Sequence, residues 1–533
     1  MNTRIKVILA LIAVVLTAAL PLRAQQSLND VDWEQVKKLQ MAQVAITCLY
    51  VDSVDQQKVA EDAIRGILAK LDPHSTYTNA KETRKLNEPI AGNFEGIGVS
   101  FNMVEDTLVV MSVIKKGPCE KAGILAGDRI VSCNDTVIAG VKMDRDSIMQ
   151  VLRGPKGSKA RLRVVRRAVT DTLVFHVTRD KIPLHTLDAA YMIDETTGYL
   201  RLTSFGAQSG KEVHNALATL RKKGMKDVIL DLSSNGGGLM SAAQDVASEF
   251  LPEGSMVVYA KGRSTADQQL RAGNGGLMQK EGRVVVVVDE YTASAAEIVS
   301  GAIQDHDRGT IIGRRTFGKG LVQRPVDLPD GSMIRLTVAH YYTPSGRCVQ
   351  KPYTKGDKAK YDKDLEARFN HGELTCIDSI HLDSTAVYKT LGKGRTVYGG
   401  GGIMPDVFVP LDTTWITPPY RQLRRYNLIN DEVLHYVDTQ RKSIKRKYSD
   451  FDKFMAQYKV PNAVIDSLYA KGERKGMTFK DKTEKEKTTS QLRLALKELV
   501  AYHVYDTNDY YRLLNQRNDL VLRAIRYLKE EEQ

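Results

Sequence analysis

Cysteine and tryptophan are scarce in this sequence. Its 533 residues include two tryptophans and five cysteines: Cys48, Cys119, Cys133, Cys348 and Cys376. Because five is an odd number, at least one thiol has no partner within the chain, and no two cysteines have the C-x-x-C spacing of a structural zinc site. A disulfide scaffold is therefore excluded, and only the pairing of Cys119 with Cys133 stays open.

Paired metal ligands and internal membrane spans are also lacking. The ten histidines show neither an H-E-x-x-H motif nor another paired spacing, so no metal site is predicted. Beyond the N-terminus no segment is apolar enough to cross a bilayer.

The N-terminus has the pattern of a secretory signal. Arg4 and Lys6 precede the apolar run Val7–Leu20, and Ala24 offers a cleavage site. Residues 1–24 are therefore predicted to be a signal peptide, and the protein to be exported, with the periplasm as the expected compartment. The alternative is an uncleaved membrane anchor. No cysteine stands near the cleavage site, which argues against a lipoprotein.

The net charge of +13 falls to +10 when the signal leaves, because Arg4, Lys6 and Arg23 go with it. The remaining positive charge is spread along the chain, and in its densest part (471–487) acidic residues alternate with basic ones. This pattern is typical of a solvated helix or loop, so no nucleic-acid partner is expected.

Hydrophobic periodicity predicts a multidomain α+β protein. Helical spacing dominates before residue 90, short strands dominate from Phe94 to Thr178, strands alternate with helices from Gly198, residues 355–396 look polar and irregular, and charged helices follow from about Tyr420. The expected division is a signal peptide (1–24), an N-terminal helical region (25–93), a strand-rich domain (94–182), an α/β domain (183–412) and a helical C-terminal extension (413–533).

Ser294 stands where a buried strand changes into a helix. The run Val284–Val288 predicts the strand, and the helix is expected to begin around Thr292 to Ser294. A serine at such a corner lies near free backbone N–H groups and the positive helix end, which favour developing negative charge. Ser294 is therefore a candidate nucleophile, although Ser294–Glu297 also fits a capping box and could be only a helix cap.

A nucleophilic serine needs a base, and no histidine lies in a recognisable partner motif. A lysine can serve if burial lowers its pKa, and Lys319, between two glycines, is a candidate. The competing interpretation is a surface lysine on a turn. Gln323, four residues later, would reach the amine along a helical or bent path but not along a straight strand.

The turn Asn235–Gly238 follows another predicted strand. Its glycines could aim backbone N–H groups at an oxyanion, a role that needs no side chain. A tight connection between a strand and a helix is the competing interpretation.

Three segments in this order, DLSSNGGG (231–238), TASAAEI (292–298) and GRRTFGKGLVQ (313–323), resemble the carboxy-terminal processing, or tail-specific, peptidases. The resemblance implies a crotonase/ClpP-like α/β catalytic domain, an acyl-enzyme mechanism, and no cofactor or metal. Roles are implied for five residues: Ser294 as nucleophile, Lys319 as base, Gln323 as its orienting partner, and the N–H groups of Gly237 and Ala295 as oxyanion donors. Asp305, which the family pattern also includes, is interpreted as structural.

The segment Gly96–Val99 resembles the carboxylate-binding loop of a PDZ domain, and Gly117–Ile130 resembles the turn signature of that domain. In such a domain a peptide tail adds as a strand while backbone N–H groups hold its carboxylate. The backbones of Ile97, Gly98 and Val99 are therefore expected to bind tails of unfolded or tail-exposed proteins. An adaptor or regulator protein and a homo-oligomer are further partners that the resemblance allows.

Two other interpretations compete. Gly313–Gly320 nearly fits a phosphate-binding loop, but Gly320 stands where a hydroxyl residue should hold Mg²⁺. A catalytically silent PDZ scaffold is the second, and the presence of both Ser294 and Lys319 argues against it.

Overall fold

The computed structural model describes residues 31–530 apart from 168, 264–266 and 382–384. The predicted signal peptide therefore lies outside the described residues, among which no helix combines the length and apolar character needed to span a bilayer. The chain divides into two compact units: the first comprises Met1–Asn87, Thr203–Ala218 and Leu232–Phe408, and the second comprises Glu88–Leu202, Thr219–Asp231 and Val409–Gln533.

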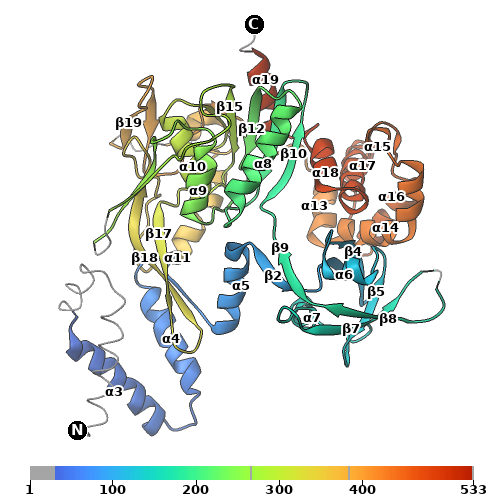
Figure 1. Ribbon diagram of the computed structural model, residues 1–533, viewed down its shortest axis with the longest axis horizontal. Coiled ribbons are helices and arrows are strands. Elements are labelled where there is room, and N and C mark those ends of the chain that lie inside the picture. The colour runs from blue at the N-terminus through green and yellow to red at the C-terminus, as the bar shows by residue number, and fades with distance from the viewer. Residues whose placement is uncertain (1–30, 168, 264–266, 382–384, 531–533) are drawn as a thin grey trace. The chain divides into compact units, whose positions relative to one another are not determined.

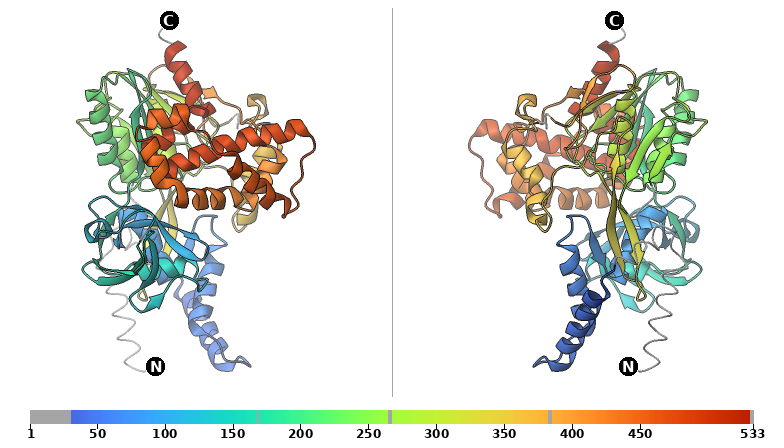
Figure 2. Two further views of the ribbon diagram at one scale, coloured as in Figure 1. Left: turned by 90° about the vertical axis from the view of Figure 1, so that its right-hand side faces the viewer. Right: turned by 90° about the vertical axis from the view of Figure 1, so that its left-hand side faces the viewer.

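The first unit begins with two helices, α3 (Trp33–Leu49) and α4 (Gln56–Leu68), which contact each other (Figure 2). Each begins where an aspartate side chain, Asp32 or Asp55, accepts a hydrogen bond from a first-turn N–H. The sequence predicted only helices here, but the strand β1 (Thr76–Thr78) follows α4. This strand forms because it pairs with β18, which is distant in sequence.

An antiparallel sheet of the first unit has the order β1–β18–β13–β14, and β17 also pairs with β18. Its other strands are β13 (Met256–Lys261), β14 (Gln268–Arg271), β17 (Leu321–Asp327) and β18 (Met333–Tyr342). The register of β17 against β18 shifts between Val322 and Gln323, so β17 is not a straight strand there.

Parallel strands and further helices complete the first unit. The parallel strands are β15 (Val284–Val288), β16 (Thr310–Gly313) and β21 (Val407–Phe408), and the helices are α9 (Met240–Ser248), α10 (Ala295–Asp305) and most of α5 (Ala80–Ala91) and α8 (Ser209–Lys222). All five valines of β15 and all eleven residues of α10 are buried. A strand buried on both faces is expected to be continuously apolar, as β15 is.

The segment 355–396, predicted to be irregular, contains short regular elements. They are α11 (Lys358–Asp362), α12 (Asp364–Asn370), a 3₁₀ turn (Ile377–Ser379) and the hairpin of β19 (Val387–Lys389) with β20 (Thr396–Tyr398). These elements were not predicted because their sequence is polar and shows no hydrophobic periodicity. Polar side chains such as Asp357 and Glu373 instead form helix caps and ion pairs.

In the second unit, the elements from β2 to β9 form a PDZ-like domain. Its antiparallel sheet has the order β3–β4–β5–β7–β8, with β6 beside β5, and β2 pairs with β9. The elements are β2 (Asn93–Gly96), β3 (Val99–Val104), β4 (Thr107–Val113), α6 (Pro118–Ala122), β5 (Arg129–Cys133), β6 (Thr136–Val137), α7 (Arg145–Leu152), β7 (Lys159–Val165), β8 (Leu173–Thr178) and β9 (Asp180–Pro183). Cys119 and Cys133, the pair left open above, are both free thiols in the core of this domain.

The second unit also contains three further strands and a helical region (residues 418–530). The strands are β10 (Leu187–Met192), β11 (Thr197–Leu202) and β12 (Asp227–Asp231), of which β10 and β12 contact the last two helices. The helices are α13 (Pro418–Arg425), α14 (Leu428–Lys447), α15 (Phe451–Gln457), α16 (Asn462–Glu473), α17 (Lys482–Val504), α18 (Thr507–Leu514) and α19 (Asp519–Glu530) (Figure 1). Helices α13 to α18 gather into a bundle around one apolar core, as the predicted helical extension requires.

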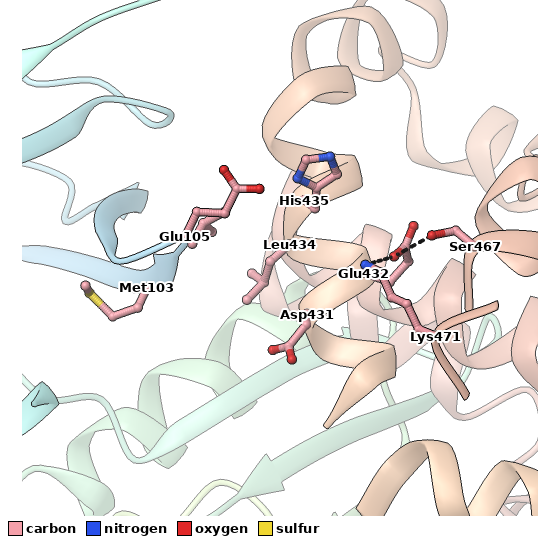
Figure 3. A pocket seen from close by; sticks show the side chains of 9 residues that line it. Met103, Glu105, Asp431, Glu432, Leu434, His435, Ser467 and Lys471 are labelled. Carbon is pink, nitrogen blue, oxygen red and sulfur yellow. Dashed lines mark hydrogen bonds and ion pairs between the residues drawn. The ribbon is translucent and has the colours of Figure 1, made fainter. Parts of the chain in front are cut away.

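The helix α14 packs on the PDZ-like domain. Leu434 is buried against Val109 and Met111 of β4, and Asp438 forms ion pairs with Arg129 at 2.5 Å and with Arg167 at 2.9 Å. On one flank of this contact lies a hollow of ≈ 610 Å³, shown in Figure 3. The other flank holds a second hollow, of ≈ 640 Å³.

Candidate active site

Ser294 occupies a strained position at the start of α10. Its backbone has φ +58° and ψ −117°, a conformation that L residues rarely adopt and that often marks functional sites. The preceding turn is held by Asp289, whose Oδ1 accepts hydrogen bonds from Tyr291 N and Thr292 N, each at 3.0 Å. The strand, the turn and the helix predicted around Ser294 are all present.

Glu297 links Ser294 to Lys319. This carboxylate is completely buried, and its Oε2 accepts hydrogen bonds from Ser294 N and Lys319 N, each at 2.8 Å. Its Oε1 accepts from Gly318 N at 2.8 Å and from Thr316 Oγ1 at 2.5 Å. The bond to Ser294 N is the return arm of the predicted capping box, and the bond to Lys319 N brings the lysine backbone to the same oxygen.

Tyr341 makes a second link between the same two residues. Its hydroxyl lies within hydrogen-bond distance of two carbonyl oxygens, that of Ser294 at 3.1 Å and that of Lys319 at 2.7 Å. Tyr341 is 1% exposed, so this link lies in the core. The backbones of residues 294 and 319 are therefore fixed beside each other from two sides.

The amine of Lys319 is half-buried and points to Gln323. Nζ donates to Gln323 Oε1 at 3.1 Å and, within the described residues, to no other group, so it forms no hydrogen bond with Ser294 Oγ. Burial lowers the pKa of Lys319 and the charge of Arg335 lowers it further, against the opposing effect of Glu297 and Asp72. A solvated surface lysine, the competing interpretation, does not fit this environment.

Gln323 reaches the amine because β17 is bulged. The register shift between Val322 and Gln323 supplies the bent path that a glutamine four residues after Lys319 requires. The amide Nε2 of Gln323 donates to the carbonyl oxygen of His74. The side chain is thus fixed at both ends of its amide.

The turn that carries His74 is held by Asp72. Asp72 Oδ1 accepts from His74 N at 2.9 Å, Ser75 N at 3.0 Å and Thr337 Oγ1 at 2.9 Å, and Asp72 Oδ2 accepts from Ser75 Oγ at 2.5 Å. These four bonds hold the His74 carbonyl toward Gln323. The Asp-Pro-His-Ser run signals such an aspartate-held turn, but nothing local shows what the turn would face.

Of the two predicted oxyanion donors, one is engaged. Gly237 lies against the serine: a Cβ at this position would lie 2.7 Å from Ser294 Cβ and 2.9 Å from Ala295 N. The N–H of Gly237 itself donates to Asn235 Oδ1 at 2.8 Å. Ala295 is the first residue of α10, where an N–H has no acceptor within the helix. The turn is tied to the serine loop by a hydrogen bond from Ala293 N to Asn235 O at 2.9 Å.

The loop Ile97–Val99 of the PDZ-like domain presents backbone donors. Ile97 O accepts from Cys119 N and Gly98 O accepts from Ile114 N, each at 3.0 Å, while the N–H groups of Ile97 and Gly98 donate to nothing in the described chain. Gly98 has φ +78°, which favours glycine. Val99 begins the strand β3.

The structure does not support a phosphate-binding loop at residues 313–320. Backbone donors in this segment, Gly318 N and Lys319 N, are bonded to the carboxylate of Glu297, and the strand β17 follows where such a loop needs a helix. Asp305 is fully buried and forms an ion pair with Arg347 at 2.7 Å, as a structural residue would.

These parts are those of a serine-type hydrolase: a strained serine at a helix N-terminus, a half-buried lysine of lowered pKa, and a glycine turn. Comparison with protein families gives matches to "Peptidase family S41" over residues 196–359, "PDZ domain" over 96–177, "Activating protease CtpB N-terminal domain" over 16–83 and "Family of unknown function (DUF8443)" over 419–506.

Similar proteins of known class support the peptidase match. The chain is 33% identical to the carboxy-terminal processing protease CtpA of Bacillus subtilis over 68% of this chain and 74% of the relative. It is 34% identical to a carboxy-terminal-processing protease of Bartonella bacilliformis, over 65% and 80% of the two chains. The chain therefore belongs to the carboxy-terminal processing serine proteases of peptidase family S41, and the resemblance drawn from its motifs is confirmed.

Among solved structures, the photosystem II D1 C-terminal processing protease is 27% identical, covers 72% of this chain and 88% of its own, and has a TM-score of 0.37. The multidomain α+β architecture is as predicted, with N-terminal helices, a PDZ domain, an S41 protease domain and a helical C-terminal region. The silent-scaffold alternative loses its support. Within the C-terminal extension, residues 419–506 match the family of unknown function.

Proposed function

We propose that this protein is an exported endopeptidase that recognises proteins by their C-terminal tails and cleaves them through an acyl-enzyme on Ser294. The observation that carries the proposal is the sharing of one Glu297 oxygen by the N–H groups of Ser294 and Lys319. The sharing fixes a hydroxyl-bearing residue beside a lysine whose pKa is lowered. The relatives' name, carboxy-terminal processing protease, supports the same activity.

In the proposed mechanism, neutral Lys319 accepts the Ser294 hydroxyl proton while Oγ attacks a peptide carbonyl. Catalytic hydrogen bonds are often long in unliganded enzymes and tighten with substrate, which accounts for the absent Ser294–Lys319 bond. The N–H of Ala295 donates to the oxyanion, and that of Gly237 joins it by exchanging Asn235 Oδ1 for the oxyanion. The Lys319 ammonium then protonates the departing amine, and water, deprotonated by the same lysine, releases the acyl group.

Tail recognition is assigned to Ile97, Gly98 and Val99, whose backbones would hold the terminal carboxylate. The proposed domains are a signal peptide (1–24), N-terminal helices (25–93), a PDZ domain (94–182), the peptidase (183–412) and a helical extension (413–533). A signal-directed, periplasmic location is supported by the Arg4, Lys6 and Val7–Leu20 pattern.

Labelling with a fluorophosphonate tests this mechanism. We expect one adduct, on Ser294. Its rate of formation should rise with pH to a plateau, with the half-maximal rate below pH 10.5, because Lys319 must lose its proton and burial lowers its pKa. Peptide mapping locates the adduct. Export is tested separately: the intact mass of the protein purified from the cell envelope shows whether the signal peptide has been cleaved after Ala24. Ser294→Ala should not label, whereas Ser300→Ala, which removes a buried hydroxyl of the same helix, should label normally. An adduct elsewhere, or a flat pH profile, would refute the assignment.

The turn at Asp72 gives a second prediction. In Asp72→Asn, the amide Nδ2 cannot accept the hydrogen bond from the Ser75 hydroxyl. The turn is then held less firmly, and with it the His74 carbonyl that anchors Gln323. We expect kcat to fall about tenfold with little change in KM. The charge of Asp72 also raises the pKa of Lys319, so its removal should shift the rise of kcat with pH to lower pH.

Asp330→Asn is the matched control for Asp72→Asn. Asp330 also accepts hydrogen bonds from the N and Oγ of a following serine, Ser332, but no described contact joins it to Lys319. We expect the pH at which kcat rises to stay at the wild-type value in Asp330→Asn and to fall in Asp72→Asn. A shift toward higher pH in Asp72→Asn would contradict the prediction.

A further inference from the structure

The segment 350–373 of the first unit holds the loop that carries Lys319, here called the lysine loop (residues 315–320). Arg368 of α12 donates Nη2 to the carbonyl oxygen of the first residue of this loop at 2.7 Å, and Nη1 to that of the second residue at 3.1 Å. Arg368 is 4% exposed, so these contacts lie inside the protein. The segment 350–373 therefore forms part of the peptidase site, although it lies outside the three peptidase motifs.

Tyr361, in α11, packs beside both the lysine loop and the turn that carries His74. It is 5% exposed, and its ring meets those of Phe317 and His74 edge-on, with ring centres 6.0 Å and 5.1 Å apart. Lys351 Nζ lies 4.1 Å from the centre of the Tyr361 ring and 4.0 Å from that of Phe317. These contacts fix the ring, and with it the position of the hydroxyl.

The two partners of the Tyr361 hydroxyl determine where its proton lies. Gln350 Oε1 accepts from Gly320 N at 2.9 Å, so the other end of this amide is the NH₂ group, which donates to the Tyr361 hydroxyl oxygen at 3.4 Å. Burial lowers the pKa of His74 to about 4, so near neutral pH its ring is uncharged and Nε2 can accept. The hydroxyl therefore donates to His74 Nε2, at 2.9 Å.

These contacts close a ring of five hydrogen bonds around the lysine. On one side, the Lys319 amine donates to Gln323, and the Gln323 amide donates to His74 O. On the other side, Tyr361 donates to the His74 ring and accepts from Gln350. Gln350 in turn accepts from the N–H of the residue that follows the lysine. His74 joins the two sides, because its carbonyl holds Gln323 while Tyr361 holds its ring.

We propose that Tyr361 is a positioning residue for the base: its hydroxyl anchors His74, whose carbonyl keeps Gln323 against the Lys319 amine. This inference rests on the proposed role of Lys319 as the base, and it gives a residue outside the peptidase motifs a part in the reaction. Without the hydroxyl, the His74 turn and the Gln323 amide are held less firmly, and water gains access to the amine.

The pH dependence of kcat distinguishes this role from a general loss of structure. Besides burial, which lowers its pKa, the Lys319 amine is affected by three charges: Arg335 on β18 lowers the pKa, whereas Glu297 on α10 and Asp72 raise it. Replacing Tyr361 by phenylalanine changes none of these charges, because burial raises the pKa of the phenol and keeps it neutral. A better hydrated amine has a pKa closer to 10.5, so the rise of kcat should move to higher pH, opposite to the shift expected for Asp72→Asn.

The test measures kcat and KM across neutral and alkaline pH for full-length wild type, Tyr361→Phe and Tyr353→Phe, on an unfolded protein substrate. Tyr361→Phe keeps the ring and loses only the hydroxyl. We expect its kcat at pH 7 to fall about fivefold, the effect of one ordinary hydrogen bond, with KM unchanged and half-maximal kcat at higher pH. Tyr353→Phe is the matched control and should behave as wild type. The ring centre of Tyr353 is 6.4 Å from that of Tyr361, and its hydroxyl forms no hydrogen bond within the described chain.

A second variant shows whether the effect passes through Gln323. Gln323→Met removes the partner of the amine and the bond to His74 O together, so adding Tyr361→Phe to it should change neither kcat nor its pH dependence further.

Three results would overturn the inference and leave the proposed function intact. They are a wild-type kcat in Tyr361→Phe, a fall in kcat with no shift in pH, and a further fivefold loss in the double variant. The second result would indicate a merely structural role, because misfolding lowers kcat by the same factor at every pH. If the wild-type enzyme cleaved no substrate, or if Lys319→Met cleaved it at the wild-type rate, the proposed function would fail and the inference with it.

Discussion

Replacing Lys319 by methionine should reduce peptide-bond hydrolysis by about three to four orders of magnitude while leaving the protein folded. Methionine keeps most of the side-chain volume but cannot accept the Ser294 proton. The measurement is kcat/KM on an unfolded protein substrate with an apolar C-terminus. The loss should fall on kcat, because the groups assigned to bind the tail lie in the PDZ domain.

The same substitution should raise stability at neutral pH. Burial lowers the pKa of Lys319 in the folded chain below the 10.5 of an exposed lysine, so folding is opposed wherever the folded amine carries a proton. This cost is present below the folded pKa and is relieved as pH rises from the folded pKa to 10.5. Lys319→Met should therefore show a higher midpoint of urea unfolding than wild type at pH 7, with a smaller difference as the pH approaches 10.5.

Lys497→Met is the matched control for Lys319→Met. Burial lowers the pKa of Lys497 as well, but this lysine lies in the helical region and donates to Met455 O. Its loss should leave kcat unchanged. If Lys319→Met kept near-wild-type hydrolysis, the base would have to be another group and the proposed mechanism would fail.

Local sequence patterns were sufficient to predict the strand and helix on either side of Ser294. Five consecutive valines favour a buried strand, and Ser294–Glu297 carries the cap of the next helix within four residues. The PDZ turn and the three peptidase motifs could also be predicted, because each is defined by glycines and charged residues that are close in sequence.

Contacts between distant segments could not be predicted. Whether Gln323 reaches Lys319 depends on a bulge set by pairing with β18, and the partner of its amide, His74 O, is 249 positions away. The strand β1 exists only because β18 pairs with it. The packing of Leu434 on β4, and with it the two hollows beside that contact, follows from a helix more than 300 residues from the sheet it covers.

Replacing Glu297 should have the second large effect, because its carboxylate accepts hydrogen bonds from both Ser294 and Lys319. In Glu297→Ala four donors lose their acceptor: Ser294 N, Lys319 N, Gly318 N and Thr316 Oγ1. An unsatisfied buried donor costs about 1–3 kcal/mol, and a relaxed site can satisfy some of the four with water, so we expect a loss of about 3–5 kcal/mol. Urea unfolding measures this loss, and kcat should fall at least about a hundredfold because residues 294 and 319 are no longer held to one oxygen.

Glu297→Gln separates the structural role of this carboxylate from its charge. The amide oxygen can still accept from Ser294 N and Lys319 N, but the NH₂ group replaces the oxygen that accepted from Gly318 N and from the Thr316 hydroxyl, so two of the four donors lose their acceptor. The glutamine variant should therefore lose less stability and retain more activity than the alanine variant. If the two variants lost the same activity, the ionic charge of Glu297 would be required; if Glu297→Ala kept both stability and kcat, Glu297 would not be what holds Ser294 beside Lys319.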